Sequence, residues 1–171
     1  MYNFIRKLIP QPLIFYIKRL FNNRNFSLKD LQNSLSQYFN YRNGFYVELG
    51  ANDGITQSNT LHLEKNLGWR GILVEPIQKR FNQCQKIRSS KNYFYNKTCV
   101  SFNFEKKNIK MVYSDLTTKV AHENYNYSQK NQNKHLDIYD KTYSFNSEVM
   151  TLNDMLIDAN APKLIDFMSL D

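Results

Sequence analysis

The chain of 171 residues has little glycine, proline or cysteine, and each scarcity excludes a class of protein. Five glycines and four prolines are too few for a collagen-like chain, and two cysteines are too few for a disulfide scaffold. Cys84 and Cys99 stand alone, without CxxC or histidine partners at the spacing of a zinc site. We therefore expect two reduced thiols in a cytoplasmic protein. Twelve phenylalanines and twelve tyrosines exclude a wholly disordered chain.

Long apolar runs are missing as well. The longest uncharged stretch near the N-terminus, residues 8–17, contains two prolines, whereas a membrane-spanning helix needs roughly 20 apolar residues. No small-residue cleavage site follows it, so we expect no secretory signal. Residues 1–25 contain five basic residues and no acidic one. They form either a basic helix that touches an anionic membrane or a helix that packs on the domain, and we favour the packed helix.

The net charge of +8 is concentrated in that N-terminal segment, so it gives little support to a nucleic-acid-binding main domain. Residues 122–143 interleave aromatic residues with lysines, but they lack the Gly-rich or RNP-like patterns typical of RNA binding, and we expect no nucleic-acid partner. His122 and His135 lie in this stretch near Asp137 and Asp140. We interpret all four as solvated loop residues rather than metal ligands.

The most informative segment predicts a strand, a glycine-containing turn and a helix. The apolar run Phe45–Leu49 ends in Gly50-Ala51-Asn52-Asp53-Gly54. Ser58 or Asn59 can then cap a helix that ends at Gly68, and His62 is expected on its surface. Such a turn lets backbone amides approach a ligand closely at the start of a helix.

The turn does not match a dinucleotide fingerprint. In G-x-G-x-x-G counted from Gly50, the third position is Asn52 and the sixth is Ile55, so close approach of a pyrophosphate is hindered. The pattern present has Glu48 at the end of the strand, followed by Gly50 and Gly54. It favours a ligand that has no phosphate, and a cationic ligand that the Glu48 carboxylate can face.

A second strand, Ile72–Val74, leads directly into Glu75 and Pro76. Glu75 lies 21 residues beyond Gly54, the spacing at which an acidic side chain can accept hydrogen bonds from both hydroxyls of a ribose. Pro76 begins a third helix with an apolar face, after which a third strand is expected at about residues 93–96. The sequence therefore predicts a nucleoside site across two neighbouring strand ends.

The remainder is less regular. We expect a helix from about Ser27, a strand at 109–113, and a long loop or insertion near 114–148. Thr151 and Asp154 have the spacing of a capping box at the start of another helix. Residues 164–170 then read as a buried strand with Asp171 at its end. The four expected core strands would lie in the spatial order third, second, first, fourth.

Three segments resemble the FkbM family of S-adenosylmethionine-dependent methyltransferases: VELGANDG (47–54), QSNTLHLEKNLGWRGILVEP (57–76) and TLNDMLIDANAPKLIDFMSLD (151–171). The resemblance implies an α/β fold, namely the Rossmann-like class I methyltransferase, with an open parallel sheet and helices on both faces. It implies O-methylation of a hydroxyl on a glycan or a secondary metabolite. Residues 1–40 would be an N-terminal helical segment, and 41–171 the cofactor-binding half of the domain, incomplete after the fourth core strand.

By position, the resemblance implies that Asp171 orients the acceptor or serves as the base. It also implies a set of residues that bind S-adenosylmethionine: Glu48, Gly50, Ala51, Asn52, Gly54, Ser58, Glu75, Pro76 and Val100. Two other hypotheses stay open at this point. One is a truncated, non-catalytic remnant or cofactor-binding module, and the other is a basic protein that binds nucleic acid or a membrane surface.

Overall fold

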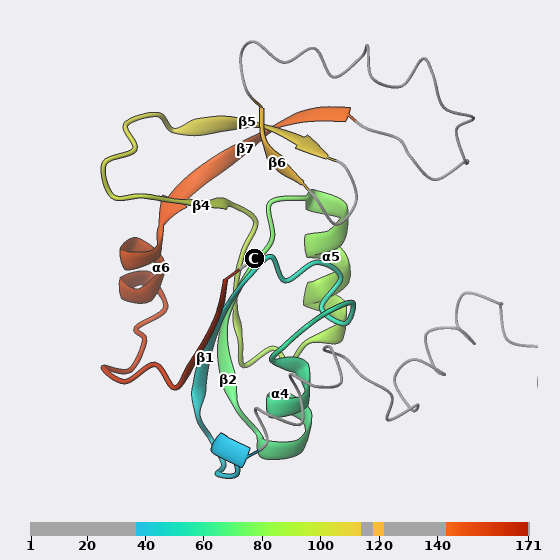
Figure 1. The fold of residues 1–171 in the computed structure, drawn as a ribbon, viewed down its shortest axis with the longest axis vertical. Coiled ribbons are helices and arrows are strands. Elements are labelled where there is room, and N and C mark those ends of the chain that lie inside the picture. The colour runs from blue at the N-terminus through green and yellow to red at the C-terminus, as the bar shows by residue number, and fades with distance from the viewer. Residues whose placement is uncertain (1–36, 114–117, 122–142, 171) are drawn as a thin grey trace, which may run out of the picture.

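The computed structural model describes residues 37–113, 118–121 and 143–170, which form a mixed α/β structure with two four-stranded sheets (Figure 1). Sheet A is parallel and has the order β3-β2-β1-β8. Its strands are β1 (Phe45–Leu49), β2 (Arg70–Val74), β3 (Tyr93–Tyr95) and β8 (Phe167–Leu170). The spatial order expected from the sequence is therefore confirmed for these four strands.

Helices lie on both faces of sheet A. Figure 1 shows α4 (Leu61–Leu67) and α5 (Gln78–Ile87) on one face and α6 (Leu152–Asp158) on the other. The side chains of β1 alternate accordingly, as a strand requires. Phe45 and Val47 belong to the apolar cluster that includes Met155 of α6, whereas Tyr46 packs with Leu63 of α4. A strand buried on both faces explains why β1 is apolar almost throughout.

The helix ends follow the signals read from the sequence. The α4 helix ends at Gly68, whose φ of 69° is left-handed and suits a residue without a side chain. At the start of α6, the Thr151 hydroxyl accepts a hydrogen bond from the Asp154 amide, so the predicted capping box is confirmed.

The expectation that His62 lies on the helix surface was wrong, because this residue is buried and neither of its ring nitrogens has a partner among the described residues. Burial lowers the pKa of His62 and keeps it neutral.

Sheet B lies above the carboxyl ends of sheet A in Figure 1 and has the order β4-β7-β5-β6. Its strands are β4 (Thr98–Val100), β5 (Asn108–Tyr113), β6 (Lys119–Val120) and β7 (Tyr143–Thr151). The expectation of a loop or insertion near 114–148 was wrong for residues 143–148, which pair with β5 over its whole length. Polar side chains alternate with aromatic ones in this part of β7, so it lacks the apolar run of a buried strand.

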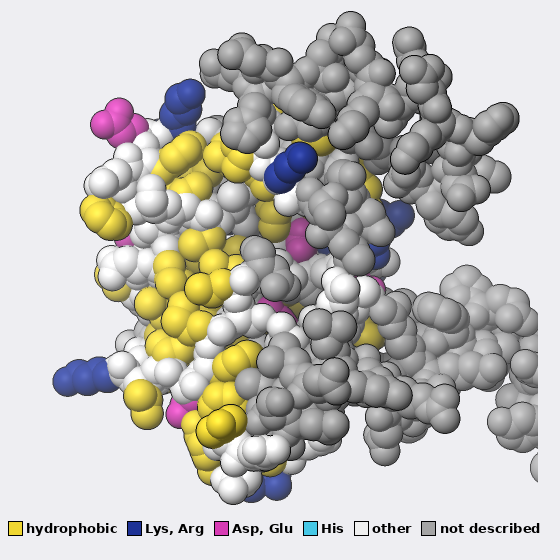
Figure 2. Space-filling model, in the orientation of Figure 1, with side chains coloured by type: hydrophobic (Ala, Val, Ile, Leu, Met, Phe, Trp, Pro, Cys, Tyr) yellow, Lys and Arg dark blue, Asp and Glu magenta, His cyan; other side chains and the backbone are white. Residues whose placement is uncertain are grey.

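Strand β8 pairs with β1 on one side and is the edge of sheet A in the described part of the chain. Figure 2 shows hydrophobic side chains gathered over the region of α6 and the neighbouring strands of sheet A. Ile157, Met168 and Leu170 are exposed. Apolar exposure on this face is therefore concentrated at the sheet edge and on α6.

Several expectations concern residues outside the described ranges: the N-terminal helices, His122, His135, Asp137, Asp140 and Asp171. Within those ranges, no helix is long and apolar enough to cross a membrane. The described side chains also contain no group of three or more potential metal ligands.

Candidate functional site

A cavity of about 230 Å³ lies at the carboxyl ends of β1 and β2, and we call it the strand-end cavity. Carboxyl ends of parallel strands are where open α/β sheets bind ligands. Its walls combine the turn after β1, the residues after β2 and the start of β4 in sheet B. The lining residues are Leu49, Gly50, Asn52, Thr56, Gln57, Val74, Glu75, Pro76, Ile77, Arg80, Lys97, Thr98, Cys99, Met111 and Thr118.

The turn after β1 is closed by its own hydrogen bonds. Gly50 and Gly54 have φ values of 80° and 81°, which let the chain fold back onto β2. The amides of residues 50–52 and 54–56 all donate within the protein: Gly50 and Ala51 to the Val74 carbonyl, Asn52 to Glu75, Gly54 to Ala51, and Ile55 and Thr56 to Asp53. These amides are therefore already paired, whereas a phosphate-binding turn presents free amides to its ligand.

Glu75 is fixed at the edge of the cavity. One carboxylate oxygen accepts a hydrogen bond from the Asn52 amide and the other from the Ile77 amide, both at 2.8 Å. The residue is 5% exposed, and burial raises the pKa of its carboxyl, although these two amides and Arg80 act in the opposite direction. Each oxygen has a further lone pair, so the carboxylate can accept two more hydrogen bonds from a ligand.

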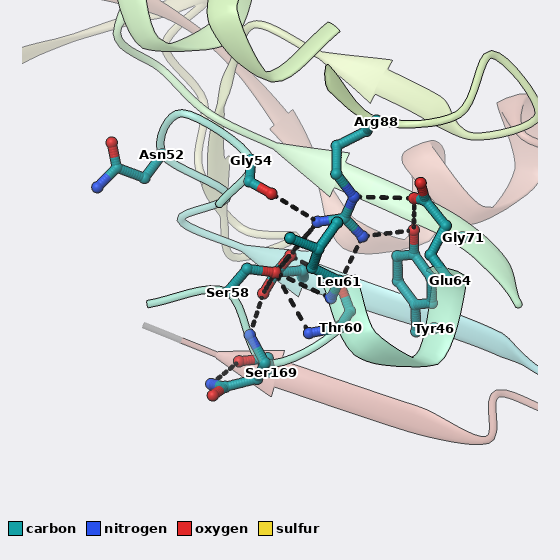
Figure 3. A network of polar contacts seen from close by, with 12 residues as sticks. Tyr46, Asn52, Gly54, Ser58, Thr60, Leu61, Glu64, Gly71, Arg88 and Ser169 are labelled. Carbon is teal, nitrogen blue, oxygen red and sulfur yellow. Dashed lines mark hydrogen bonds and ion pairs between the residues drawn. The ribbon is translucent and has the colours of Figure 1, made fainter. Parts of the chain in front are cut away.

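Two polar atoms in the cavity have no partner. The Asn52 Oδ1 and Thr98 Oγ1 atoms are buried and make no hydrogen bond to any described residue, and both residues line the strand-end cavity. Figure 3 shows the Asn52 side chain pointing away from the polar network behind the turn. Because buried polar atoms are nearly always hydrogen-bonded, this pair marks where a polar ligand would complete the structure.

Glu48 does not face the cavity, contrary to the sequence-based expectation. Its carboxylate accepts hydrogen bonds from the Asn59 amide and the Thr60 hydroxyl, both at 2.8 Å. It also contacts the Ser58 hydroxyl at 3.1 Å and the Arg88 guanidinium at 3.2 Å. The alternation of β1 explains the result, since Glu48 lies on the same side as Tyr46, facing α4 and α5. Glu48 and Ser58 therefore hold the turn from behind.

Arg88 is the centre of this network, which Figure 3 shows in detail. Its side chain is fully buried and binds the Glu64 carboxylate at 2.8 Å as well as Glu48. It also donates to the Tyr46 hydroxyl and the Gly54 carbonyl, so it links α5 to β1 and to the turn. Burial alone would raise the pKa of Glu64, but Arg88, with hydrogen bonds from Ser89 and Asn92, lowers it to about 2.

The network reaches β8 through one side chain. The Asn59 amide group donates to the Ser169 hydroxyl at 2.8 Å, while the Asn59 backbone amide binds Glu48. The consecutive residues Ser58, Asn59 and Thr60 thus tie the end of β1 to the end of β8.

The structure brings four of the nine expected cofactor residues together at the cavity, and Glu48 and Ser58 lie in the network behind it. Gly50, Asn52, Glu75 and Pro76 line the strand-end cavity, whereas Ala51, Gly54 and Val100 do not. Ala51 packs into the core. Thr98 and Cys99, which precede Val100 on β4, line the cavity, and Val100 itself does not.

Sequence reasoning missed Lys97 and Met111 in the cavity and Glu64 and Arg88 in the network. The only signal for Arg88 was its position four residues after Cys84, on the apolar face of the predicted helix. No local pattern links Met111 to the turn after β1, since sheet B brings it there.

A comparison with protein families gives a match to the model described as "Methyltransferase FkbM domain" over residues 48–171. The matched residues contain the strand-end cavity and, apart from Tyr46, the polar network behind it. The searches of curated proteins and of solved structures gave no match.

Proposed function

Because the chain belongs to the FkbM methyltransferase family, we propose that it transfers a methyl group from S-adenosylmethionine to a hydroxyl group, with the cofactor in the strand-end cavity. The observation that carries this proposal is the chemistry of the cavity: a fixed carboxylate and two unpartnered polar atoms beside a turn whose amides are already paired. A nucleoside without phosphate fits this set of groups.

Each part of the ligand has a matching group. The Glu75 carboxylate would accept hydrogen bonds from both ribose hydroxyls, and Asn52 Oδ1 and Thr98 Oγ1 would bind polar atoms of the amino acid and the base. Pro76, Cys99 and Met111 offer apolar surface to an adenine ring. Phosphate-bearing dinucleotides fit less well, because the amides that would bind a pyrophosphate donate to protein oxygens.

When bound, S-adenosylmethionine supplies a methyl group on a positively charged sulfur. The protein's contribution would be to position this group and an acceptor hydroxyl in line and to remove the hydroxyl proton. Asp171 is our candidate for that base, since it follows β8, the strand next to β1. We propose a hydroxyl of a glycan or a secondary metabolite as the acceptor.

The Rossmann-like class I assignment is part of the same proposal. It is supported by the parallel order β3-β2-β1-β8 and by helices on both faces of sheet A. A cytoplasmic location is supported by the two free cysteines, Cys84 and Cys99.

The test is titration calorimetry of S-adenosylhomocysteine into the wild-type chain and into Glu75→Gln, with Glu105→Gln as the matched control. Glu105 is exposed and lies outside the cavity. We expect binding to the wild type and the control, and an affinity about 10- to 100-fold lower for Glu75→Gln, because hydrogen bonds to a charged group are lost. Equal affinities in all three proteins would refute the site. Binding without methyl transfer to any hydroxyl acceptor would favour a cofactor-binding module.

A further inference from the structure

A second cavity, which no part of the proposed function uses, lies between the first turn of α5 and the underside of β7. It has a volume of about 740 Å³, within the range of about 300–1,000 Å³ found for ligand sites. We call it the aromatic cavity after Phe94, Tyr143 and Phe145 in its lining. It shares Pro76, Ile77 and Lys97 with the strand-end cavity, so the two cavities adjoin.

The Tyr143 and Phe145 rings come from one face of sheet B, and Phe94 comes from β3 of sheet A. Tyr143 and Phe145 are two residues apart on β7 and therefore point to the same side. On β5 they lie opposite Tyr113 and Met111, and the Tyr113 and Tyr143 rings stack at 4.9 Å with an interplanar angle of 28°. Met111 lines the strand-end cavity, so the same sheet face covers both cavities. The stack holds Tyr143 in place although 47% of its surface is exposed.

The rim of the aromatic cavity is polar but carries little net charge. Its carboxylate, Glu148, pairs with Lys97 at 2.7 Å, which leaves Lys79 as the remaining charged group among the lining residues. Gln78 is exposed at the rim, where its Nε2 donates to Asn82 Oδ1 at 2.8 Å and its Oε1 can accept a hydrogen bond. A polyanion would require more cations, and a lipid chain would require fewer polar groups.

We propose that the aromatic cavity binds a neutral saccharide ring. Such a ring has apolar C–H faces that pack on the Tyr143 and Phe145 rings, and hydroxyls that donate hydrogen bonds to the Gln78 carboxamide oxygen. The cavity adjoins the strand-end cavity after β2 and β3, on the side of sheet A away from β8. A saccharide bound in the aromatic cavity would therefore lie away from the place where Asp171 is expected.

The test is a glycan array that contains neutral and anionic oligosaccharides, probed with the labelled wild-type chain and followed by calorimetry with the best neutral ligand. We expect binding to neutral glycans and an affinity about tenfold lower for Phe145→Ala. Gln78→Ala is a milder second variant, since this exposed side chain can be shortened without opening the core. Phe102→Ala is the matched control, because Phe102 is 84% exposed and lies outside the cavity.

Several results would overturn the proposal. They are no neutral ligand on the array, binding only to anionic glycans or to single-stranded RNA, and neutral-glycan binding that both cavity variants keep at wild-type strength. Saccharide binding requires no cofactor, so S-adenosylhomocysteine titrated into the same variants separates the two proposals. We expect Phe145→Ala and Gln78→Ala to bind S-adenosylhomocysteine as the wild type does, because neither residue lines the strand-end cavity.

Discussion

Arg88 offers the sharpest test of how the turn after β1 is held in place. Replacing it by methionine keeps most of the side-chain volume but removes the charge between Glu48 and Glu64, which lie within 3.2 Å and 2.8 Å of the guanidinium. Glu48 would then lack its cation, and Glu64 would keep only the exposed Lys65 at 3.3 Å. Breaking a buried ion pair by removing one partner typically costs about 3–5 kcal/mol. Arg88 also donates to Tyr46, Ser58 and Thr60, so we expect the upper end of this range.

The measurement is urea unfolding at pH 7, followed by circular dichroism, for the wild type and Arg88→Met. Lys86→Met is the matched control, because it removes an exposed cation from the same helix. Small domains have unfolding free energies of only about 5–15 kcal/mol, so Arg88→Met should lose a large part of the stability. Adding Glu64→Gln to Arg88→Met should restore part of the loss, since it removes one of the two buried carboxylate charges. A loss below about 1 kcal/mol for Arg88→Met, comparable with the control, would refute the reasoning.

Three further outcomes follow from the same contacts. The pKa of Glu64 is about 2 in the folded chain against an ordinary value of 4.5. Its ionised form should therefore contribute about 3 kcal/mol to the free energy of unfolding above pH 4.5, and this contribution is lost as the pH falls to 2. In urea unfolding between pH 7 and 3, the stability of Glu64→Gln should depend much less on pH than that of the wild type. Gly71→Ala should unfold at lower urea by about 3 kcal/mol, because the new Cβ would lie 2.1 Å from the Tyr46 carbonyl oxygen, and unchanged stability would contradict the close approach of β1 and β2. Asn52→Gly and Thr98→Val should each weaken S-adenosylhomocysteine binding about three- to tenfold in calorimetry. Neither variant should lose stability, since neither side-chain oxygen has a partner among the described residues. Unchanged affinity would show that these atoms do not belong to the site.

Local patterns predicted the parts of the fold that depend on neighbouring residues. The run Phe45–Leu49, the left-handed glycine after α4 and the capping box at Thr151 are all set within a few residues of the chain. The order of the four strands of sheet A could be predicted as well, because parallel strands joined by helices leave few arrangements. Glu75 also lies where its spacing from Gly54 predicted, at the edge of the cavity.

The direction of the Glu48 side chain was harder to predict than its position. Both Glu48 and Leu49 end β1, and only the alternation along the strand decides which of them faces the cavity. Leu49 lines the cavity, and Glu48 points to Arg88, 40 residues away in the chain. An acidic residue at a strand end therefore indicates a ligand only after a buried cationic partner has been excluded.

Sheet B was missed because its strands are brought together by contacts distant in the sequence. Strand β7 pairs with β5 through polar positions such as Ser144 and Asn146, which a search for apolar runs reads as loop. Met111 reaches the strand-end cavity, and Tyr143 reaches the aromatic cavity, only as members of this sheet.

The most direct test of the proposed function is a crystal structure of the chain with S-adenosylhomocysteine. The account predicts the ligand in the strand-end cavity, with both ribose hydroxyls within hydrogen-bond distance of the Glu75 carboxylate and the adenine against Cys99 and Met111. It also predicts that the Asn52 and Ile77 amides keep their bonds to Glu75. A ligand bound elsewhere, or bound in the cavity with its ribose away from Glu75, would contradict the account.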